Sequence, residues 1–340
     1  MTTEDRVLAV GLIGCGNMGG SHAKQMAALQ TIRLAAACDV DETKARATAE
    51  AAGEGVAVFS DVDQLLADAR VPAVIVATPN FTHKEIVLKA LAAGKDVFCE
   101  KPMALTVADC DEMIGAARQH GRKLMVGQVL RLITVFAEVR RLVSEGLIGT
   151  PRAIRVLRAG ARSAGRGDRQ RATWRMKRQN TGGLLFEVNV HEFDFMRAIM
   201  GEVAEVSATM ENFFHPEQDY EDHVVVSLRF RDGGVGVLEA STAHAIGTTE
   251  GLVTGEKGSI HYNWGRNMLA YRLVDAGNEL VDVPVERDAG RSVQSELASF
   301  ARWVLHDEAP VVTAEDGRRA VQLAEAAYRS AQEKRAVTID

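Results

Sequence analysis

The feature that most constrains this fold is a glycine loop directly after the first apolar segment. Residues 7–13 form a continuous apolar run, typical of a strand buried on both faces of a parallel sheet. The segment Gly14-Cys15-Gly16-Asn17-Met18-Gly19 follows it and opens a helical pattern. Glycines at this spacing allow a tight turn, close approach of a pyrophosphate to the backbone, and close helix–strand packing. The helix N-terminus adds free N–H groups for phosphates. The pattern therefore predicts a dinucleotide-binding site.

An acidic residue at the end of the second predicted strand narrows the choice of dinucleotide. Asp39 follows the strand over residues 33–38 and lies 20 residues beyond Gly19, where ribose recognition requires a carboxylate. Such a carboxylate accepts a hydrogen bond from a ribose 2′-OH and repels a 2′-phosphate. The next residues are Val40, Asp41 and Glu42, with no arginine. We therefore expect NAD as the cofactor, with NADP less favoured.

The first 126 residues alternate short apolar strands with helical patterns. A capping-box spacing at Thr82–Glu85 opens one helix, which Gly94 closes. This alternation of strands and helices predicts an α/β Rossmann domain with a doubly wound parallel sheet over residues 1–126. The predicted strands are 7–13, 33–38, 55–59, 73–77, 96–99 and 123–126, and the other predicted helices are 16–29, 41–52 and 107–120.

The pattern of predicted secondary structure changes after residue 127. Strand-length segments there follow one another with short turns between them, such as Arg231–Gly234 and Gly255–Gly258, which indicates antiparallel pairing. We expect a C-terminal α+β domain over residues 127–340, with an open, mainly antiparallel sheet. Its predicted strands are 151–161, 204–212, 222–230, 234–241, 251–254 and 268–274, and its helices lie near 132–145, 184–200, 292–306 and 313–332.

Composition excludes several classes of protein. No apolar run reaches the length of a membrane span, and the polar, acidic start of the chain is unlike a secretory signal. A net charge of −6 argues against nonspecific nucleic-acid binding. The four cysteines show no metal-like pairing, so we expect buried thiols, no metal site and a cytoplasmic protein. They are Cys15, Cys38, Cys99 and Cys110.

Polar residues follow the fourth and fifth predicted strands. In open α/β sheets, ligands bind beyond the carboxyl ends of the strands. Thr78-Pro79-Asn80-Phe-Thr-His83 follows one strand and Glu100-Lys101-Pro102 follows the next. The lysine, restrained by the proline after it, could hold a substrate oxygen and stabilise alkoxide charge. A surface ion pair is the alternative, and the triplet alone does not decide between them.

A second set of titratable residues lies on the helix predicted near 184–200. Glu187, His191 and Asp194 recur at i, i+4 and i+7, which places them on one face of an α-helix. A histidine backed by a carboxylate is a natural general base near neutral pH. Taken alone, such a pair is more often structural.

Residues 152–178 carry ten Lys and Arg against the single acid Asp168. Three interpretations stay open: recognition of a carboxylate, phosphate or extended glycoside, contact with an acidic patch on a neighbouring subunit, or a solvated loop. Trp174 is the only aromatic residue of the stretch, so a nucleic-acid groove is not expected. The arginines concerned are Arg158, Arg162, Arg166, Arg169, Arg171 and Arg175.

Together these motifs resemble the Gfo/Idh/MocA family of sugar and polyol oxidoreductases. The resemblance covers essentially the whole chain. It rests on Val-Gly-Leu-Ile-Gly-Cys-Gly-Asn-Met-Gly at 10–19, Ala-Thr-Pro-Asn-Phe-Thr-His at 77–83, Glu-Lys-Pro at 100–102, Trp-Arg before Gly-Gly at 182–183, and acid-x-x-x-His-x-x-Asp at 187–194. The last motif looks most like the inositol dehydrogenase-like branch.

The resemblance implies roles for individual residues. Lys101 corresponds to the family's substrate-binding lysine and His191 to its catalytic histidine, while Glu187 replaces the usual aspartate with a longer side chain. The cofactor-binding residues so expected are Gly14, Cys15, Gly16, Asn17, Met18, Gly19, Asp39, Thr78, Pro79, Asn80, His83, Glu100, Lys101 and Gln128. The substrate-binding residues are Lys101, Arg131, Trp174, Arg175, Glu187, Asn189 and His191.

The hypothesis is an NAD-dependent dehydrogenase that oxidises a secondary hydroxyl of a cyclic polyol, sugar or glycoside. In it Lys101 polarises the oxygen, and His191 accepts the proton with Glu187 beside it. The resemblance also implies a homodimer or homotetramer formed through the open sheet. The alternatives are an NADPH-linked keto-sugar reductase and a non-enzymatic dinucleotide sensor on the same scaffold.

Overall fold

The computed structural model describes residues 6–161, 173–277 and 279–340. Contacts between residues divide the chain into two compact units. The N-terminal unit comprises residues 1–129 and 290–321, and the C-terminal unit comprises residues 130–289 and 322–340. The sequence predicted that the N-terminal domain ends at residue 126. Residues 290–321 nevertheless belong to the N-terminal unit.

The N-terminal unit is built on a six-stranded parallel sheet in the order β3-β2-β1-β4-β5-β6, which confirms the doubly wound prediction. The chain moves outward from β1 to β3 and then restarts on the other side of β1 with β4. The carboxyl ends of β1 and β4 therefore flank the switch point where ligands bind in such sheets. The strands are β1 Leu8–Ile13, β2 Ile32–Cys38, β3 Ala57–Phe59, β4 Ala73–Val76, β5 Asp96–Glu100 and β6 Leu124–Gly127.

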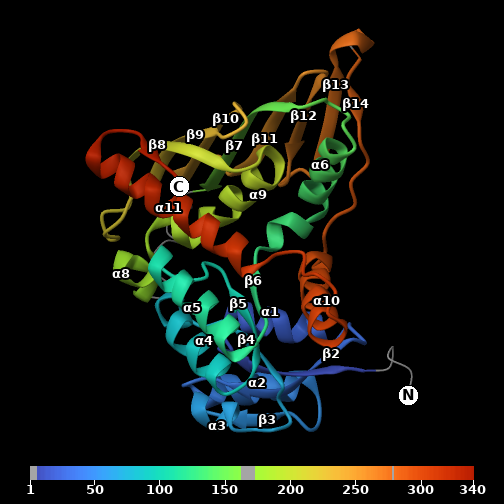
Figure 1. The fold of residues 1–340 in the computed structure, drawn as a ribbon, viewed down its shortest axis with the longest axis vertical. Helices are drawn as coiled ribbons and strands as arrows, with labels where there is room; N and C mark the ends of the chain where they lie inside the picture. Colours follow the sequence, from blue (N-terminus) through green and yellow to red (C-terminus); the bar gives the residue numbers. More distant parts are fainter. Residues whose placement is uncertain (1–5, 162–172, 278) are drawn as a thin grey trace. The chain divides into compact units, whose positions relative to one another are not determined.

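Helices cover this sheet, and one of them comes from far along the chain (Figure 1). In α10, Leu297, Phe300 and Ala301 are buried in the same apolar cluster as strands β1 and β2. Phe300 meets Phe98 of β5 edge to face, with ring centroids 5.8 Å apart. This burial explains why residues 290–321 fold with the N-terminal unit. The helices are α1 Asn17–Met26, α2 Glu42–Ala52, α3 Val62–Leu66, α4 His83–Ala92, α5 Val107–His120 and α10 Arg291–His306.

The predicted capping box at Thr82 is wrong. A 3₁₀ turn over Asn80–Thr82 leads into α4, so the backbone of Thr82 is already helical and its side chain caps no amide. Its hydroxyl instead donates to the carbonyl of Pro79. The short helix α3 was not predicted at all, because five residues are too few to show a helical period.

The C-terminal unit is built on a nine-stranded sheet in the order β14-β13-β12-β11-β7-β10-β9-β8-β15. All neighbouring strands are antiparallel except β7 and β10, which confirms the prediction of a mainly antiparallel sheet. The strands β12, β14 and β15 were not predicted. The bounds are β7 Pro151–Ala161, β8 Val203–Glu211, β9 His223–Phe230, β10 Val235–His244, β11 Thr248–Gly255, β12 Gly258–Asn263, β13 Met268–Leu273, β14 Val281–Asp282 and β15 Val337–Thr338.

The two faces of this sheet differ. Along β9 the side chains alternate between buried and accessible, as a half-buried strand requires. Helices α6 and α9 and the C-terminal half of α11 lie on one side of the sheet (Figure 1). The accessible side chains define its open face. The helical segments are α6 Thr134–Ser144, α8 Arg178–Thr181, the π turn Leu185–Asn189, α9 Val190–Met200 and α11 Ala314–Glu333. None of the helices in the described ranges is long and apolar enough to cross a membrane.

The first testable consequence concerns the contact between α1 and the glycine loop. A Cβ on Gly19 would lie 1.9 Å from the carbonyl oxygen of Gly14, whereas a Cβ on Gly20 would meet nothing within 4 Å. We expect Gly19→Ala to lower the free energy of unfolding by about 1–3 kcal/mol through overpacking. Gly20→Ala, the matched control, is expected to leave it unchanged or raise it by about 0.5–1 kcal/mol. Urea unfolding measures both, and equal stability of the two variants would contradict the close contact.

Candidate active site

The glycine loop turns sharply at the carboxyl end of β1. Gly14 has a φ of +95°, and a Cβ there would lie 2.6 Å from the carbonyl oxygen of Ala77. Gly16 is exposed at the N-terminus of α1, with nothing within 4 Å of a Cβ built on it. Gly14 and Gly19 thus serve packing, while the backbone at Gly16 faces open space. These residues fit a dinucleotide, because the free N–H groups of α1 begin where a pyrophosphate has room.

Asp39 lies beside this loop. One carboxylate oxygen accepts a hydrogen bond from the N–H of Cys15 at 2.8 Å, and the other accepts from the N–H of Asp41 at 2.9 Å. The side chain therefore ties the end of β2 to the glycine loop. Because each carboxylate oxygen has two lone pairs, both can still accept a hydrogen bond from a ribose hydroxyl.

A buried acid supports Lys101 at the end of β5. Glu100 bonds the buried ring of His22 on α1 at 2.6 Å, and its other oxygen accepts from the N–H of Lys101 at 3.1 Å. Burial opposes ionisation of Glu100, but the contacts with His22 and Lys101 outweigh it and lower its pKa. The acid of the Glu-Lys-Pro triplet is thus a buried anion that orients the backbone of the lysine. The Lys101 side chain is half-buried.

His83 joins the two polar loops that the sequence placed at the strand ends. Its ring is buried, with Nδ1 2.8 Å from the carbonyl of Pro102 and Nε2 2.9 Å from the carbonyl of Thr78. Burial lowers its pKa, and a neutral imidazole donates to only one of these carbonyls at a time. His83 therefore holds the loop after β4 against the turn that follows Lys101. Asn80 and Gln128, also expected at the cofactor, are buried.

The four cysteines are buried and free, which confirms the expectation of buried thiols. Burial raises the pKa of each, to about 12 for Cys38. Thiols of this kind are poor nucleophiles.

In the C-terminal unit, the helical segment with the predicted base starts at two glycines whose backbone conformation other residues rarely adopt. Gly182 and Gly183 have φ angles of +82° and +96°, and a Cβ on Gly183 would lie 2.2 Å from the hydroxyl of Tyr328. The chain then enters a π turn over Leu185–Asn189 before α9. Single π turns inside helices are frequent at functional sites.

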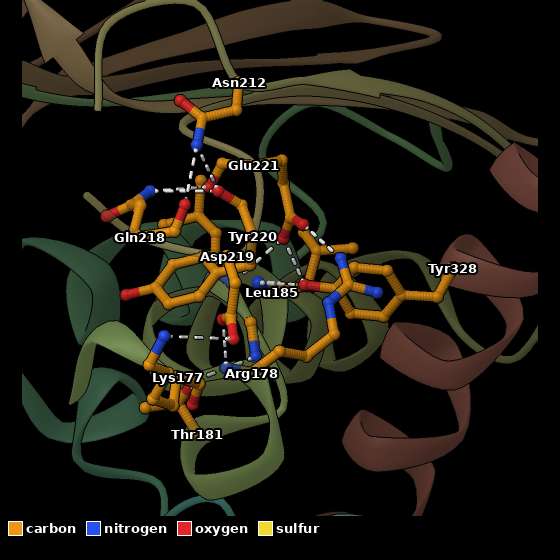
Figure 2. Close-up of polar contacts among 12 residues, drawn as sticks. Lys177, Arg178, Thr181, Leu185, Asn212, Gln218, Asp219, Tyr220, Glu221 and Tyr328 are labelled. Carbon is orange, nitrogen blue, oxygen red and sulfur yellow. Dashed lines mark hydrogen bonds and ion pairs between the residues drawn. The ribbon is translucent and has the colours of Figure 1, made fainter. Parts of the chain in front are cut away.

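Glu221 and Tyr328 hold the start of this segment (Figure 2). The buried carboxylate of Glu221 accepts from the N–H of Leu184 at 3.0 Å and from the Tyr328 hydroxyl. That hydroxyl accepts in turn from the N–H of Leu185 at 3.2 Å. Burial and the charge of Glu221 raise the pKa of Tyr328 well above its ordinary value, so the hydroxyl keeps the proton it donates.

Arg178 completes this anchor. It pairs with Glu221 at 2.5 Å, and its guanidinium lies 4.4 Å from the centre of the Tyr328 ring. The cation thus compensates the buried carboxylate. Sequence reasoning missed Glu221 and Tyr328, because their partners are 37 and 143 residues away and no local pattern marks them.

The prediction that one regular α-helix carries Glu187, His191 and Asp194 is wrong. Glu187 lies in the π turn and the other two lie in α9, so the spacing of a regular α-helix does not apply between them. Asp194 is buried and accepts two hydrogen bonds from Arg131, at 2.6 Å from Nε and 2.5 Å from Nη2. Arg131, expected at the substrate, is thus also one half of a buried bidentate ion pair.

Three of the predicted substrate residues do come together. Arg175 Nε lies 3.1 Å from a carboxylate oxygen of Glu187, and its guanidinium lies 5.0 Å from the centre of the Trp174 ring. Asn189 is buried, and its amide donates to Glu192 at 3.0 Å, so this group already has a partner within the protein.

The basic stretch is described only at its two ends. Arg158 pairs with the buried Glu192 at 3.4 Å and lies over the ring of Trp264. Arg162, Arg166, Arg169 and Arg171 lie outside the described residues, so the three interpretations of the stretch remain as they were.

A Rossmann unit with this glycine loop and acid, followed by an α+β unit with an acid–histidine helix, defines a class of dinucleotide-dependent oxidoreductase. The comparison with protein families agrees. Residues 8–128 match the model described as "Oxidoreductase family, NAD-binding Rossmann fold" and residues 136–261 match the "GFO/IDH/MocA C-terminal domain". The chain belongs to the Gfo/Idh/MocA family, and it is an oxidoreductase.

Named relatives span nearly the full length. The chain is 32% identical to a myo-inositol 2-dehydrogenase of Thermotoga maritima over 98% of this chain and 99% of the relative. It is 31% identical to inositol 2-dehydrogenase 2 of Saccharopolyspora erythraea over 94% and 92%. Among solved structures, GenD2 from gentamicin A biosynthesis, in complex with NAD, superimposes with a TM-score of 0.84 at 26% identity, covering 98% of this chain and 97% of that one.

Proposed function

We propose that the protein is an NAD-dependent dehydrogenase that oxidises a secondary hydroxyl of a cyclic polyol, sugar or glycoside. The observation that carries the proposal is the position of Lys101. It follows β5 at the carboxyl edge of the sheet, where the glycine loop also lies, and the buried Glu100 orients its backbone. A cation at this edge can act on a substrate held next to a bound dinucleotide. The inositol dehydrogenases among the relatives support a cyclic polyol as the substrate.

In the proposed reaction, bound NAD supplies the acceptor for the hydride that leaves the alcohol carbon. The ammonium group of Lys101 binds the hydroxyl oxygen and stabilises the negative charge that develops on it. A neutral His191 takes the hydroxyl proton as general base. Lys101 and His191 lie in different units, so the proposal requires both units to meet one substrate.

Glu187 and its neighbours have a positioning role in this proposal. The π turn and the Glu221–Tyr328 anchor fix where the helix with His191 begins. Glu187 is paired with Arg175, so its carboxylate is already oriented by a cation beside Trp174. We propose that these three residues border the substrate.

The first experiment combines a panel of polyols and sugars with two variants. On a panel member that reduces NAD, we expect Lys101→Met and His191→Ala each to lower kcat by about 100-fold to 10,000-fold, the range for a lost charge stabiliser or general base. NAD affinity should stay nearly unchanged. The readouts are absorbance of the reduced cofactor and calorimetric Kd for NAD.

Lys89→Met and His306→Ala serve as controls on exposed sites of α4 and α10 and should leave kcat unchanged. Unchanged turnover in the Lys101 or His191 variant would contradict the assignment. If the protein bound NAD tightly but no panel member reduced it, the non-enzymatic dinucleotide sensor would be favoured instead.

A second experiment addresses the choice between NAD and NADP. The wild-type protein should bind NAD more tightly than NADP because the Asp39 carboxylate repels a 2′-phosphate. Asp39→Ala should weaken NAD binding about tenfold or more and reduce the preference for NAD. Asp41→Ala removes an equal charge two residues away, from an exposed helix cap, and should change the preference little. Calorimetry gives the six dissociation constants of the three proteins for the two cofactors, and a wild-type preference for NADP would favour the keto-sugar reductase.

We also propose that the open face of the nine-stranded sheet joins two or four copies of the chain. Val225, Val237 and Leu252 are each about two-fifths exposed (40%, 39% and 42%) and lie on this face. Exposed apolar side chains gathered on one face of a sheet are typical of an interface. Light scattering should show a dimer or tetramer for the wild type and a smaller species for Val237→Glu. Val274→Glu, at a residue exposed outside the strands, should not dissociate it; a monomeric wild type would contradict the proposal.

A further inference from the structure

Two histidines and one glutamate meet at one end of the open face. His223 begins β9, and Glu239 and His244 belong to β10. One oxygen of Glu239 lies 3.9 Å from Nε2 of His223 and 3.8 Å from Nε2 of His244. The two imidazole rings are stacked, with centroids 5.6 Å apart and planes at 25°. One carboxylate oxygen thus faces two ring nitrogens, with all three ligand atoms within 4.8 Å of one another.

A register irregularity brings the third residue to this face. His223 pairs with Ser241, so it shares a face with Glu239, two residues earlier on β10. In a regular strand His244 would point to the opposite face, because side chains alternate. The register against β7 shifts between Ser241 and His244, and such irregularities re-aim side chains. The backbone therefore turns His244 toward the other two residues.

The contacts within the cluster leave a ligand position open. Both distances to Glu239 exceed normal hydrogen-bond lengths. Nε2 of His244 is shielded from solvent and has no hydrogen-bond partner among the described residues. A buried nitrogen without a hydrogen-bond partner destabilises the folded state. An atom between the three groups would satisfy this nitrogen and both neighbours.

We propose that His223, Glu239 and His244 bind a divalent transition-metal ion of the Zn²⁺ type. Two imidazole nitrogens and one carboxylate oxygen form a common three-residue ligand set for zinc, which completes its coordination with water. Tetrahedral zinc requires ligand atoms about 3.3 Å apart, so small side-chain rotations suffice. Mg²⁺ and Ca²⁺ prefer oxygen ligands and fit this set poorly.

The surroundings of the cluster add an apolar contact and a further acid. The ring of Phe213 lies 6.3 Å from that of His223 and gives the site an apolar side. Glu211 is paired with His223 across β8 and β9, which brings a second carboxylate to the same face. The ion would join the start of β9 to the end of β10. His191 is carried by α9, on the side of the sheet opposite this face (Figure 1), so the site is separate from the proposed base.

The test measures metal binding directly on chelator-treated, full-length protein. Calorimetry with Zn²⁺ should show one equivalent bound per chain, and Co²⁺ should give the visible bands of a tetrahedral site. His223→Gln, Glu239→Gln and His244→Gln should each weaken Zn²⁺ binding by 100-fold or more. His261→Gln is the matched control, since this histidine lies on the same face at β12, opposite Leu252 of β11. This variant should bind Zn²⁺ as the wild type does.

Glu239→Gln keeps the size of the side chain, and circular dichroism of each variant checks that it is folded. Zinc should raise the Tm of the wild type and not that of Glu239→Gln, because a ligand that binds only the folded state stabilises it. The proposal is overturned if no saturable binding occurs below about 100 µM Zn²⁺. It is equally overturned if the three variants bind normally while His191→Ala does not, since the ion would then bind at the proposed base.

Discussion

In both units a buried carboxylate binds backbone N–H groups close to the residues that we propose to be reactive. Glu100 accepts from the N–H of Lys101, and Glu221 accepts from the N–H of Leu184 at the start of the helix with His191. A buried charge is costly unless it is paired, and here His22 and Arg178 are the partners. Each buried and paired acid therefore holds a backbone segment in place near a residue that we propose to act on substrate.

Local patterns were enough to predict the elements whose boundaries depend on their own residues. Helix α5 begins and ends where predicted, because Thr106 accepts from the N–H of Asp109 at one end and Gly121 adopts a left-handed conformation at the other. The capping box at Thr82 failed although its spacing was correct, because the preceding 3₁₀ turn makes Thr82 helical. A cap depends on the conformation of the residue before the helix, which the motif does not specify.

The same distinction between local patterns and distant contacts applies to the candidate site. The glycine loop and Asp39 belong to one strand–helix–strand motif with a fixed spacing, and the structure joins them through the N–H of Cys15. The pairing of Arg131 with Asp194 spans 63 residues and could not be read from either residue, since each has many possible partners in the chain. The π turn was equally hidden, because one added residue changes the helical register without changing the apolar composition.

Side chains alternate along β9 and β10, so the two faces of the sheet carry different groups. The buried positions pack beneath the helices, and the accessible positions form the open face. One register irregularity between Ser241 and His244 decides whether this face carries a pair of ligands or a complete set of three. The metal-binding cluster and the helix with His191 therefore depend on different parts of the backbone. A change in the strand register at residue 244 would remove the cluster and leave the Glu221–Tyr328 anchor in place.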